Sequence, residues 1–156
     1  MFAAKKIGWT LAAVITGMVS IQGVSNAADT PEEAAIEYRQ AAYTMIRHHF
    51  SAMGDMVKGD TEFNAETFKQ DADTLANLSH YPINGFIDGS YTGDTDAKPE
   101  IAENMDDFRE KMKNFQVEAA NLASAAESGD MGQIKPQFGK VGQSCKACHD
   151  SYREKD

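Results

Sequence analysis

The sequence contains little cysteine, little positive charge and little alternating apolar and polar sequence. Only two of its 156 residues are cysteines. It has 15 lysines and arginines against 24 aspartates and glutamates, which gives a formal net charge of −9. Phosphate backbones repel a chain of this charge, which argues against nucleic acid as a partner. No segment alternates apolar and polar residues with a period of two, which argues against a half-buried β-strand.

Long apolar runs are confined to the N-terminus. Two lysines precede an apolar run at residues 7–19, and Ser25 and Ala27 then occupy the −3 and −1 positions of a plausible cleavage site. This order is typical of a secretory signal peptide. The alternative is a membrane anchor, but the run is short for a span, which needs ~20 mostly apolar residues. We predict a cleaved signal at residues 1–27 and an exported domain, free of the membrane, at residues 28–156.

The exported part shows four segments in which apolar residues recur at steps of three and four, as in helices that bury one face. The first two are expected to begin after the caps Thr30 and Asn64. The predicted segments are 31–58, 65–80, 99–126 and a last one ending near Tyr152. The pattern predicts an all-α fold, an antiparallel up-down-up-down four-helix bundle.

Two details of these boundaries follow from glycine and proline. Residues 81–98 are rich in glycine and aspartate and lack a helical period, so we expect a long connection there. Pro136 lies in the last segment, where a proline costs a backbone hydrogen bond. We therefore expect the last helix to be continuous only from about Lys135.

The two cysteines lie in the last segment, within GQSCKACHDSYREKD. Cys145 and Cys148 are three residues apart, so a helix presents both sulfurs on one side, here the inward face. A disulfide between them would close a very small loop and restrain little. The pattern C-x-x-C-H is typical of c-type heme attachment. We predict one covalent heme c on the C-terminal helix, with thioethers from both cysteines and His149 as the axial iron ligand.

Other uses of the cysteines fit less well. A thioredoxin-like dithiol pair follows a strand in a βαβ context, which is absent here. A zinc site needs four ligands. It would require one of the remaining histidines, His48, His49 or His80, and we interpret these as solvated surface residues. Another helix must cover the second face of the heme, and the first helix is the best candidate because its core-facing seam contains Tyr43.

The chain resembles cytochrome c′, the class II c-type cytochromes, over essentially its whole exported length. Three segments carry the resemblance: EYRQAAYTMIRHHFSAM in the first helix, DAKPEI before the third, and FGKVGQSCKACHDSYREK in the last. It implies a four-helix bundle that binds nitric oxide and carbon monoxide and forms a homodimer.

The resemblance also implies roles for further residues. Arg39 and Gln40 match positions that contact the heme propionates, and Asp96 matches a position at the heme edge. Tyr43 matches the distal position, on the sixth-ligand side of the iron. Arg153 matches a basic residue near the proximal histidine. Each of three residues also has an alternative interpretation without a role at the heme. Arg39 would be a solvated helix arginine, Tyr43 would only pack in the core, and Arg153 would complement the helix dipole.

We expect a periplasmic heme protein with five-coordinate high-spin iron, which is redox-active and binds nitric oxide and carbon monoxide, with nitric oxide sequestration as its role. The alternative is a soluble electron carrier with six-coordinate heme and an unidentified redox partner. Met45 lies close to the distal position in sequence but points away on the helix. The distal seam lacks an acid–base pair such as that of a peroxidase, so we do not expect an enzyme.

Overall fold

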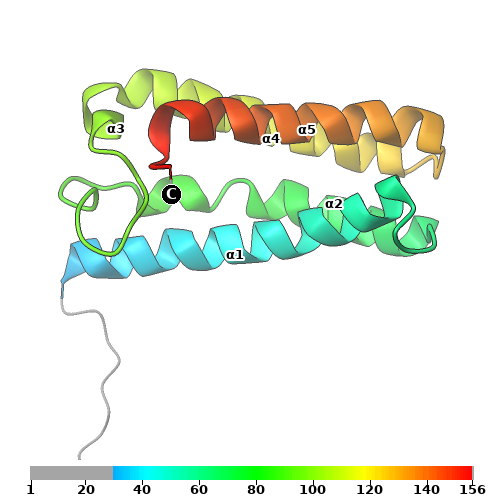
Figure 1. Cartoon of the computed structure of the whole chain (residues 1–156), viewed down its shortest axis with the longest axis horizontal. Helices are drawn as coiled ribbons and strands as arrows, with labels where there is room; N and C mark the ends of the chain where they lie inside the picture. The colour runs from blue at the N-terminus through cyan, green and yellow to red at the C-terminus, as the bar shows by residue number, and fades with distance from the viewer. Residues whose placement is uncertain (1–29, 156) are drawn as a thin grey trace, which may run out of the picture.

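Four long helices, joined by turns and one long loop, make up most of residues 30–155, the part of the chain that the computed structural model describes. The predicted signal peptide lies outside these residues. The elements are α1 (Pro31–Lys58), α2 (Ala65–Leu78), η1 (Pro82–Gly85), α3 (Glu100–Glu103), α4 (Met105–Ala126) and α5 (Met131–Tyr152). The long helices lie side by side along one axis, with α4 and α5 on one side and α1 on the other (Figure 1). The predicted all-α four-helix bundle is confirmed.

Local capping sets the ends of α1 and the start of α2, as predicted. The Thr30 hydroxyl accepts from the Glu33 amide at 3.2 Å, and the Glu33 carboxylate accepts from the Thr30 amide at 3.0 Å. Gly59 ends α1 with a φ of 85°, a left-handed conformation that glycine adopts readily. The Asn64 side chain accepts from the Thr67 amide at 2.9 Å.

The third helical segment is interrupted, which the apolar period did not predict. α3 ends at Glu103, and the backbone of Asn104 leaves the helical region at φ −125° and ψ 38° before α4 begins. The Asn104 side-chain amide donates to the Glu100 carbonyl at 2.9 Å. Asparagine competes with the backbone for such bonds, which is why it favours helix ends over helix interiors.

The prediction that the last helix is continuous only from about Lys135 was wrong. α5 begins at Met131, directly after the cap Asp130, and Pro136 lies inside it. The carbonyl that loses its partner to a proline is the one four residues earlier. Here that residue is Gly132, exposed in the first turn, where water can satisfy the carbonyl and no side chain adds to the crowding.

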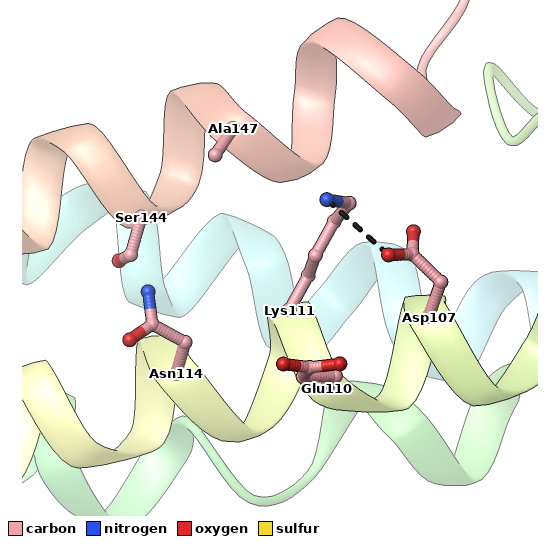
Figure 2. A pocket seen from close by; sticks show the side chains of 6 residues that line it. All are labelled: Asp107, Glu110, Lys111, Asn114, Ser144 and Ala147. Atoms are coloured by element: carbon pink, nitrogen blue, oxygen red, sulfur yellow. Dashed lines mark ion pairs between the residues drawn. The ribbon is translucent and has the colours of Figure 1, made fainter.

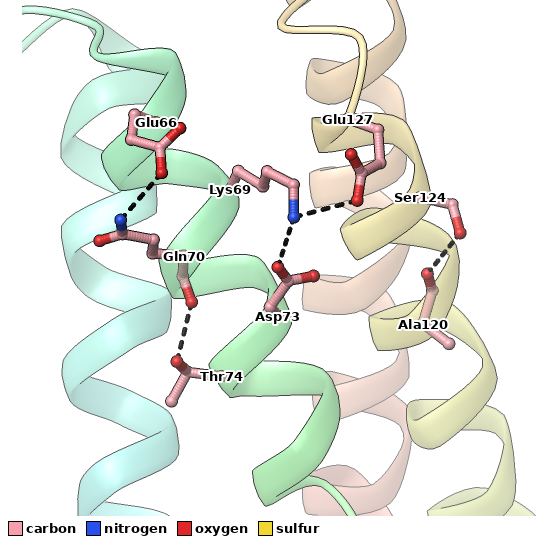
Figure 3. A network of polar contacts seen from close by, with 8 residues as sticks. All are labelled: Glu66, Lys69, Gln70, Asp73, Thr74, Ala120, Ser124 and Glu127. Atoms are coloured by element: carbon pink, nitrogen blue, oxygen red, sulfur yellow. Dashed lines mark hydrogen bonds and ion pairs between the residues drawn. The ribbon is translucent and has the colours of Figure 1, made fainter.

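The helices pack around a main apolar cluster to which all four long helices contribute. A polar contact ties two of them at the surface: Lys69 of α2 lies between Asp73 at 2.7 Å and Glu127, the residue directly after α4, at 3.0 Å (Figure 3). α1 packs much more closely against α2 than against α5. Stacked rings of Phe50 and Phe138, with centroids 4.3 Å apart, join α1 and α5.

A second, smaller cluster draws on the 81–98 loop, α3, α4 and the last turn of α5. The loop and the end of α5 lie at the same end of the bundle (Figure 1). The buried members of the cluster are Tyr91, Ile101, Phe108, Met112 and Tyr152. Among the described residues, no helix is both long and apolar enough to cross a membrane.

Candidate functional site

Both cysteines lie on α5 as free, partly buried thiols. Cys145 packs against the main apolar cluster and Cys148 against the second cluster. The two cysteines therefore lie where the two clusters adjoin. Burial raises the pKa of both thiols, that of Cys148 to about 11. The structure therefore places two protonated thiols in an apolar setting on the inner side of the last helix, as the motif predicted.

His149 follows on the exposed side of the same turn. Partial burial and the nearby Arg153 lower the pKa of its imidazole, while Asp150 opposes the shift. A lowered pKa favours neutral imidazole, the form that binds iron.

Tyr43 reaches the two cysteines from α1. Burial raises the pKa of its phenol well above the ordinary value, and the neighbouring Cys148 and Cys145 add to the shift. Its hydroxyl lies 3.6 Å from the sulfur of Met112 on α4. The phenol stays protonated at physiological pH, and a neutral phenol is a poor ligand for iron. The distal position implied by the resemblance thus carries a side chain that fills space without a strong donor.

Arg39, one turn before Tyr43, is 2 % exposed and is not the solvated helix arginine of the alternative reading. Its guanidinium donates to the carbonyls of Gly85 and Ser90, both at 2.5 Å, and to the hydroxyls of Ser90 and Thr95, both at 2.8 Å. It also lies over the Phe86 ring, 4.6 Å from the centroid. Arg39 therefore ties the 81–98 loop to α1.

Gln40 makes a similar contact, since its side-chain amide donates to the Asp94 carbonyl at 2.7 Å. Asp96 and Arg153, which the resemblance assigns to opposite parts of the site, form an ion pair with each other at 2.9 Å. The sequence did not predict any of these loop contacts. The propionate and heme-edge roles of Arg39, Gln40 and Asp96 stay predictions.

The sequence also missed Tyr91. This loop residue is 8 % exposed and belongs to the cluster against which Cys148 packs. Its hydroxyl is buried and has no hydrogen-bond partner among the described residues. A buried polar atom without a partner is costly and is uncommon in native structures. It lies in a segment without helical period, so no sequence pattern pointed to it.

These observations fit a covalently bound heme. Two thiols lie on the inner side of α5 with a neutral histidine next to them. The packing between α1 and α5 is sparse, and the buried Tyr91 hydroxyl has no hydrogen-bond partner among the described residues. All of this agrees with a flat, mostly apolar group that carries polar edges. Cys145 and Cys148 would attach it, and His149 would hold its iron.

A separate polar hollow of about 220 Å³ lies between α4 and α5 (Figure 2). Its lining is polar and includes the Lys111–Asp107 ion pair at 3.6 Å. The residues that line it are Asp107, Glu110, Lys111, Asn114, Ser144 and Ala147. Ligand sites for large apolar groups are lined mainly by apolar side chains, so we do not assign the heme to this hollow.

The remaining histidines lie away from the cysteines in sequence. His48 and His80 are exposed, as predicted. His49 differs from the expected solvated residue, because it is partly buried and its Nδ1 lies 2.8 Å from Asp71. Within residues 30–155, no three histidine, cysteine or acidic side chains cluster closely enough to hold a metal ion.

Comparisons with known proteins agree with this site. The family model "Cytochrome C'" matches residues 34–153. Cytochrome c' of Alcaligenes xylosoxydans is 41% identical over 123 residues, which cover 79% of this chain and 95% of the relative. The structure of cytochrome c prime from Shewanella frigidimarina is 48% identical with a TM-score of 0.78, and the match covers 80% of this chain and 97% of that one.

Structures of variants of cytochrome c prime from Alcaligenes xylosoxidans are also similar. A nitric oxide complex has a TM-score of 0.75, and a carbon monoxide-bound variant has one of 0.74. Both are 40% identical and cover 80% of this chain and 97% of that chain. The family match spans nearly all of the described residues, and these relatives are matched over almost their whole length. This chain belongs to the cytochrome c′ family.

Proposed function

We propose that this protein carries one heme c and binds nitric oxide and carbon monoxide at five-coordinate, high-spin iron. We propose further that it acts in the periplasm after its signal peptide is removed, that it is redox-active, and that it serves to sequester nitric oxide. Family membership supports the heme, and the nitric oxide and carbon monoxide complexes of the Alcaligenes relative support the gases.

The observation that carries the proposal is the identity of the side chain at the distal position. Tyr43 is neutral at physiological pH, because burial raises the pKa of its phenol. Met45, the thioether nearest to it in sequence, is 47% exposed and lies two positions on, about halfway round the helix from Tyr43. Neither side chain supplies a strong sixth ligand, which leaves that position open to a small gas.

The chain's own residues have separable tasks in this proposal. Cys145 and Cys148 would bind the heme covalently, and His149 would hold its iron. Tyr43 and the apolar side chains around it exclude water from the distal side. The heme, when bound, supplies iron with one free coordination position. Since the Tyr43 hydroxyl contacts a thioether, which neither takes nor delivers protons, we propose a ligand-binding protein rather than an enzyme.

The alternative, a six-coordinate electron carrier with an unidentified redox partner, has one observation in its favour. Met112 is 3 % exposed, and its thioether sulfur contacts the hydroxyl of Tyr43, the predicted distal residue. A methionine that reached the iron would make it low-spin and closed to gases. The contact with the Tyr43 hydroxyl engages this sulfur, which supports the five-coordinate proposal.

The optical spectrum of the purified ferrous protein tests the proposal. We expect a high-spin spectrum and direct carbon monoxide binding. Tyr43→Met should shift the protein toward a low-spin spectrum and weaken gas binding. Met45→Leu is the matched control and should change neither. A low-spin ferrous spectrum in the unmutated protein, with no carbon monoxide binding, would make the electron carrier the better reading.

We also propose a homodimer. Tyr38 and Met45 are 42% and 47% exposed, and they lie seven residues apart on α1, which places them on the same helix face. Exposed apolar side chains grouped on one face favour a protein contact. A second copy of the same chain is the partner that the family resemblance implies.

A further inference from the structure

The ion pair between Asp96 and Arg153 joins the 81–98 loop to the end of the heme-bearing helix. One carboxylate oxygen of Asp96 accepts from Nη2 of Arg153 at 2.9 Å and from Nε at 3.2 Å. The side chains are 58% and 49% exposed, so water screens the pair. The contact fixes the orientation of the guanidinium more than it stabilises the fold.

Backbone bonds hold Asp96 in place independently of its carboxylate. The Glu154 amide donates to the Asp96 carbonyl at 2.8 Å, and the Lys98 amide donates to the Tyr152 carbonyl at 3.0 Å. Ala97 and Arg153 form an isolated antiparallel bridge between these bonds. A change that removes only the carboxylate charge therefore leaves this attachment intact.

Arg153 lies one turn after His149, and its amide donates to the His149 carbonyl at 3.1 Å. The ion pair with Asp96 holds its guanidinium at this end of α5, one turn from the His149 backbone. A positive charge beside an axial histidine disfavours ferric iron, because the ferric form carries one more positive charge than the ferrous form. A carboxylate that orients and balances this cation has the opposite effect.

We propose that Asp96 is a positioning residue of the heme site, which holds and balances Arg153 beside His149 and thereby lowers the reduction potential of the iron. This inference rests on the heme of the proposed function and is independent of gas binding. The couple is the simplest one: ferric iron takes up one electron from a redox mediator and becomes ferrous, and no bond to the protein forms or breaks.

Spectroelectrochemical titration of the purified holoprotein tests this inference. The variants are Asp96→Asn, Arg153→Gln and the double variant. Asp94→Asn is the matched control, since it removes one exposed carboxylate from the same loop, while the Asp94 carbonyl keeps its bond to Gln40. Circular dichroism of each variant checks that the helical fold is retained.

We expect Asp96→Asn to raise the potential more than Asp94→Asn does, and Arg153→Gln to lower it. In the Arg153→Gln background, the two aspartate changes should shift the potential equally. The reason is that the larger rise expected for Asp96→Asn acts through Arg153. This excess should also shrink as ionic strength rises, since salt screens half-exposed charges.

Equal shifts for Asp96→Asn and Asp94→Asn in the unmutated background would overturn the inference. So would an excess for Asp96→Asn that persists without Arg153. A holoprotein that shows the expected shifts but binds no carbon monoxide would contradict the proposed gas-binding function and support this inference. A protein purified without heme would contradict both.

Discussion

The hydroxyl of Tyr43 lies 3.6 Å from the sulfur of Met112, across the interior between α1 and α4. Tyr43 also neighbours both cysteines, so this contact joins the predicted distal residue to the part of the core beside the heme attachment. A thioether is a weak acceptor. The contact therefore restrains the phenol without making it rigid, as suits a side chain that an incoming gas must displace.

Met112→Leu should release Tyr43 and speed carbon monoxide association. Leucine keeps the volume and apolar character of the site, a swap that cores tolerate well, and removes only the acceptor. We expect about a twofold to tenfold increase, because a hydrogen bond contributes about 1 kcal/mol or less here. Stopped-flow or flash photolysis measures it, with Met53→Leu, another buried methionine, as the control. The same change in a Tyr43→Phe background should have no effect, and a full effect there would contradict this role.

Replacement of both cysteines, Cys145→Ala with Cys148→Ala, should abolish covalent heme in the exported protein. The thioethers are the bonds that resist denaturation, whereas axial ligation by His149 does not survive it. Acid–solvent extraction of the denatured protein followed by absorbance measures the heme that remains. Ser144→Ala, a change next to Cys145 that leaves both thiols, should retain heme. Covalent heme in the double variant would show that the motif had been misassigned.

Arg39→Lys should destabilise the protein by about 2–4 kcal/mol, because one ammonium cannot replace a planar group that donates to four acceptors, three of them in buried bonds. The Ser90 carbonyl, among others, would lose a charged donor. Urea unfolding followed by circular dichroism measures the loss. Arg47→Lys, at an exposed position of the same helix, should be nearly neutral. If both variants unfold at the same urea concentration, Arg39 does not hold the loop as we infer.

Tyr152→Phe should flatten the alkaline limb of the stability curve. Burial and the hydrogen bond to Asp107 raise the pKa of Tyr152 to about 12, against about 10 for an unfolded tyrosine. The folded state thus retains a proton that the unfolded state loses. The stabilisation is complete below about pH 10 and is lost as the pH rises toward 12. Urea midpoints measured from pH 8 to 11.5 should fall less steeply in the variant, and equal slopes would contradict the assignment.

Met45→Lys should convert a dimer into a monomer at micromolar concentration. It places a strongly hydrated charge in the proposed interface, next to Tyr38 on the same face of α1. Sedimentation equilibrium of the mature heme protein measures the mass. Val117→Lys alters an exposed apolar residue of α4 in the same way and should leave the dimer unchanged. A monomeric unmutated protein would remove the proposed homodimer and leave the heme site untouched.

The sequence by itself determined the helices and the attachment motif, because both depend on residues close together in the chain. Thr30 and Asn64 cap their helices through amides three residues away. The spacing of Cys145 and Cys148 alone puts both sulfurs on one side of a helix, and His149 follows directly in the chain. Predictions from local sequence were wrong at two positions. The apolar period predicted a continuous third helix, but Asn104 interrupts it. The proline predicted a late start of the last helix, but Pro136 lies inside α5.

Only the tertiary structure decided which distant groups meet. The sequence did not indicate that Arg39 would bind the 81–98 loop or that Asp96 would pair with Arg153, as they do in the fold. Met112 lies beside Tyr43 although 69 residues separate them. Tyr91 is buried although its segment shows no helical period, and its hydroxyl has no hydrogen-bond partner within residues 30–155. These contacts arise from the packing of helices and a loop remote in sequence, and no local periodicity encodes which side chains that packing brings together.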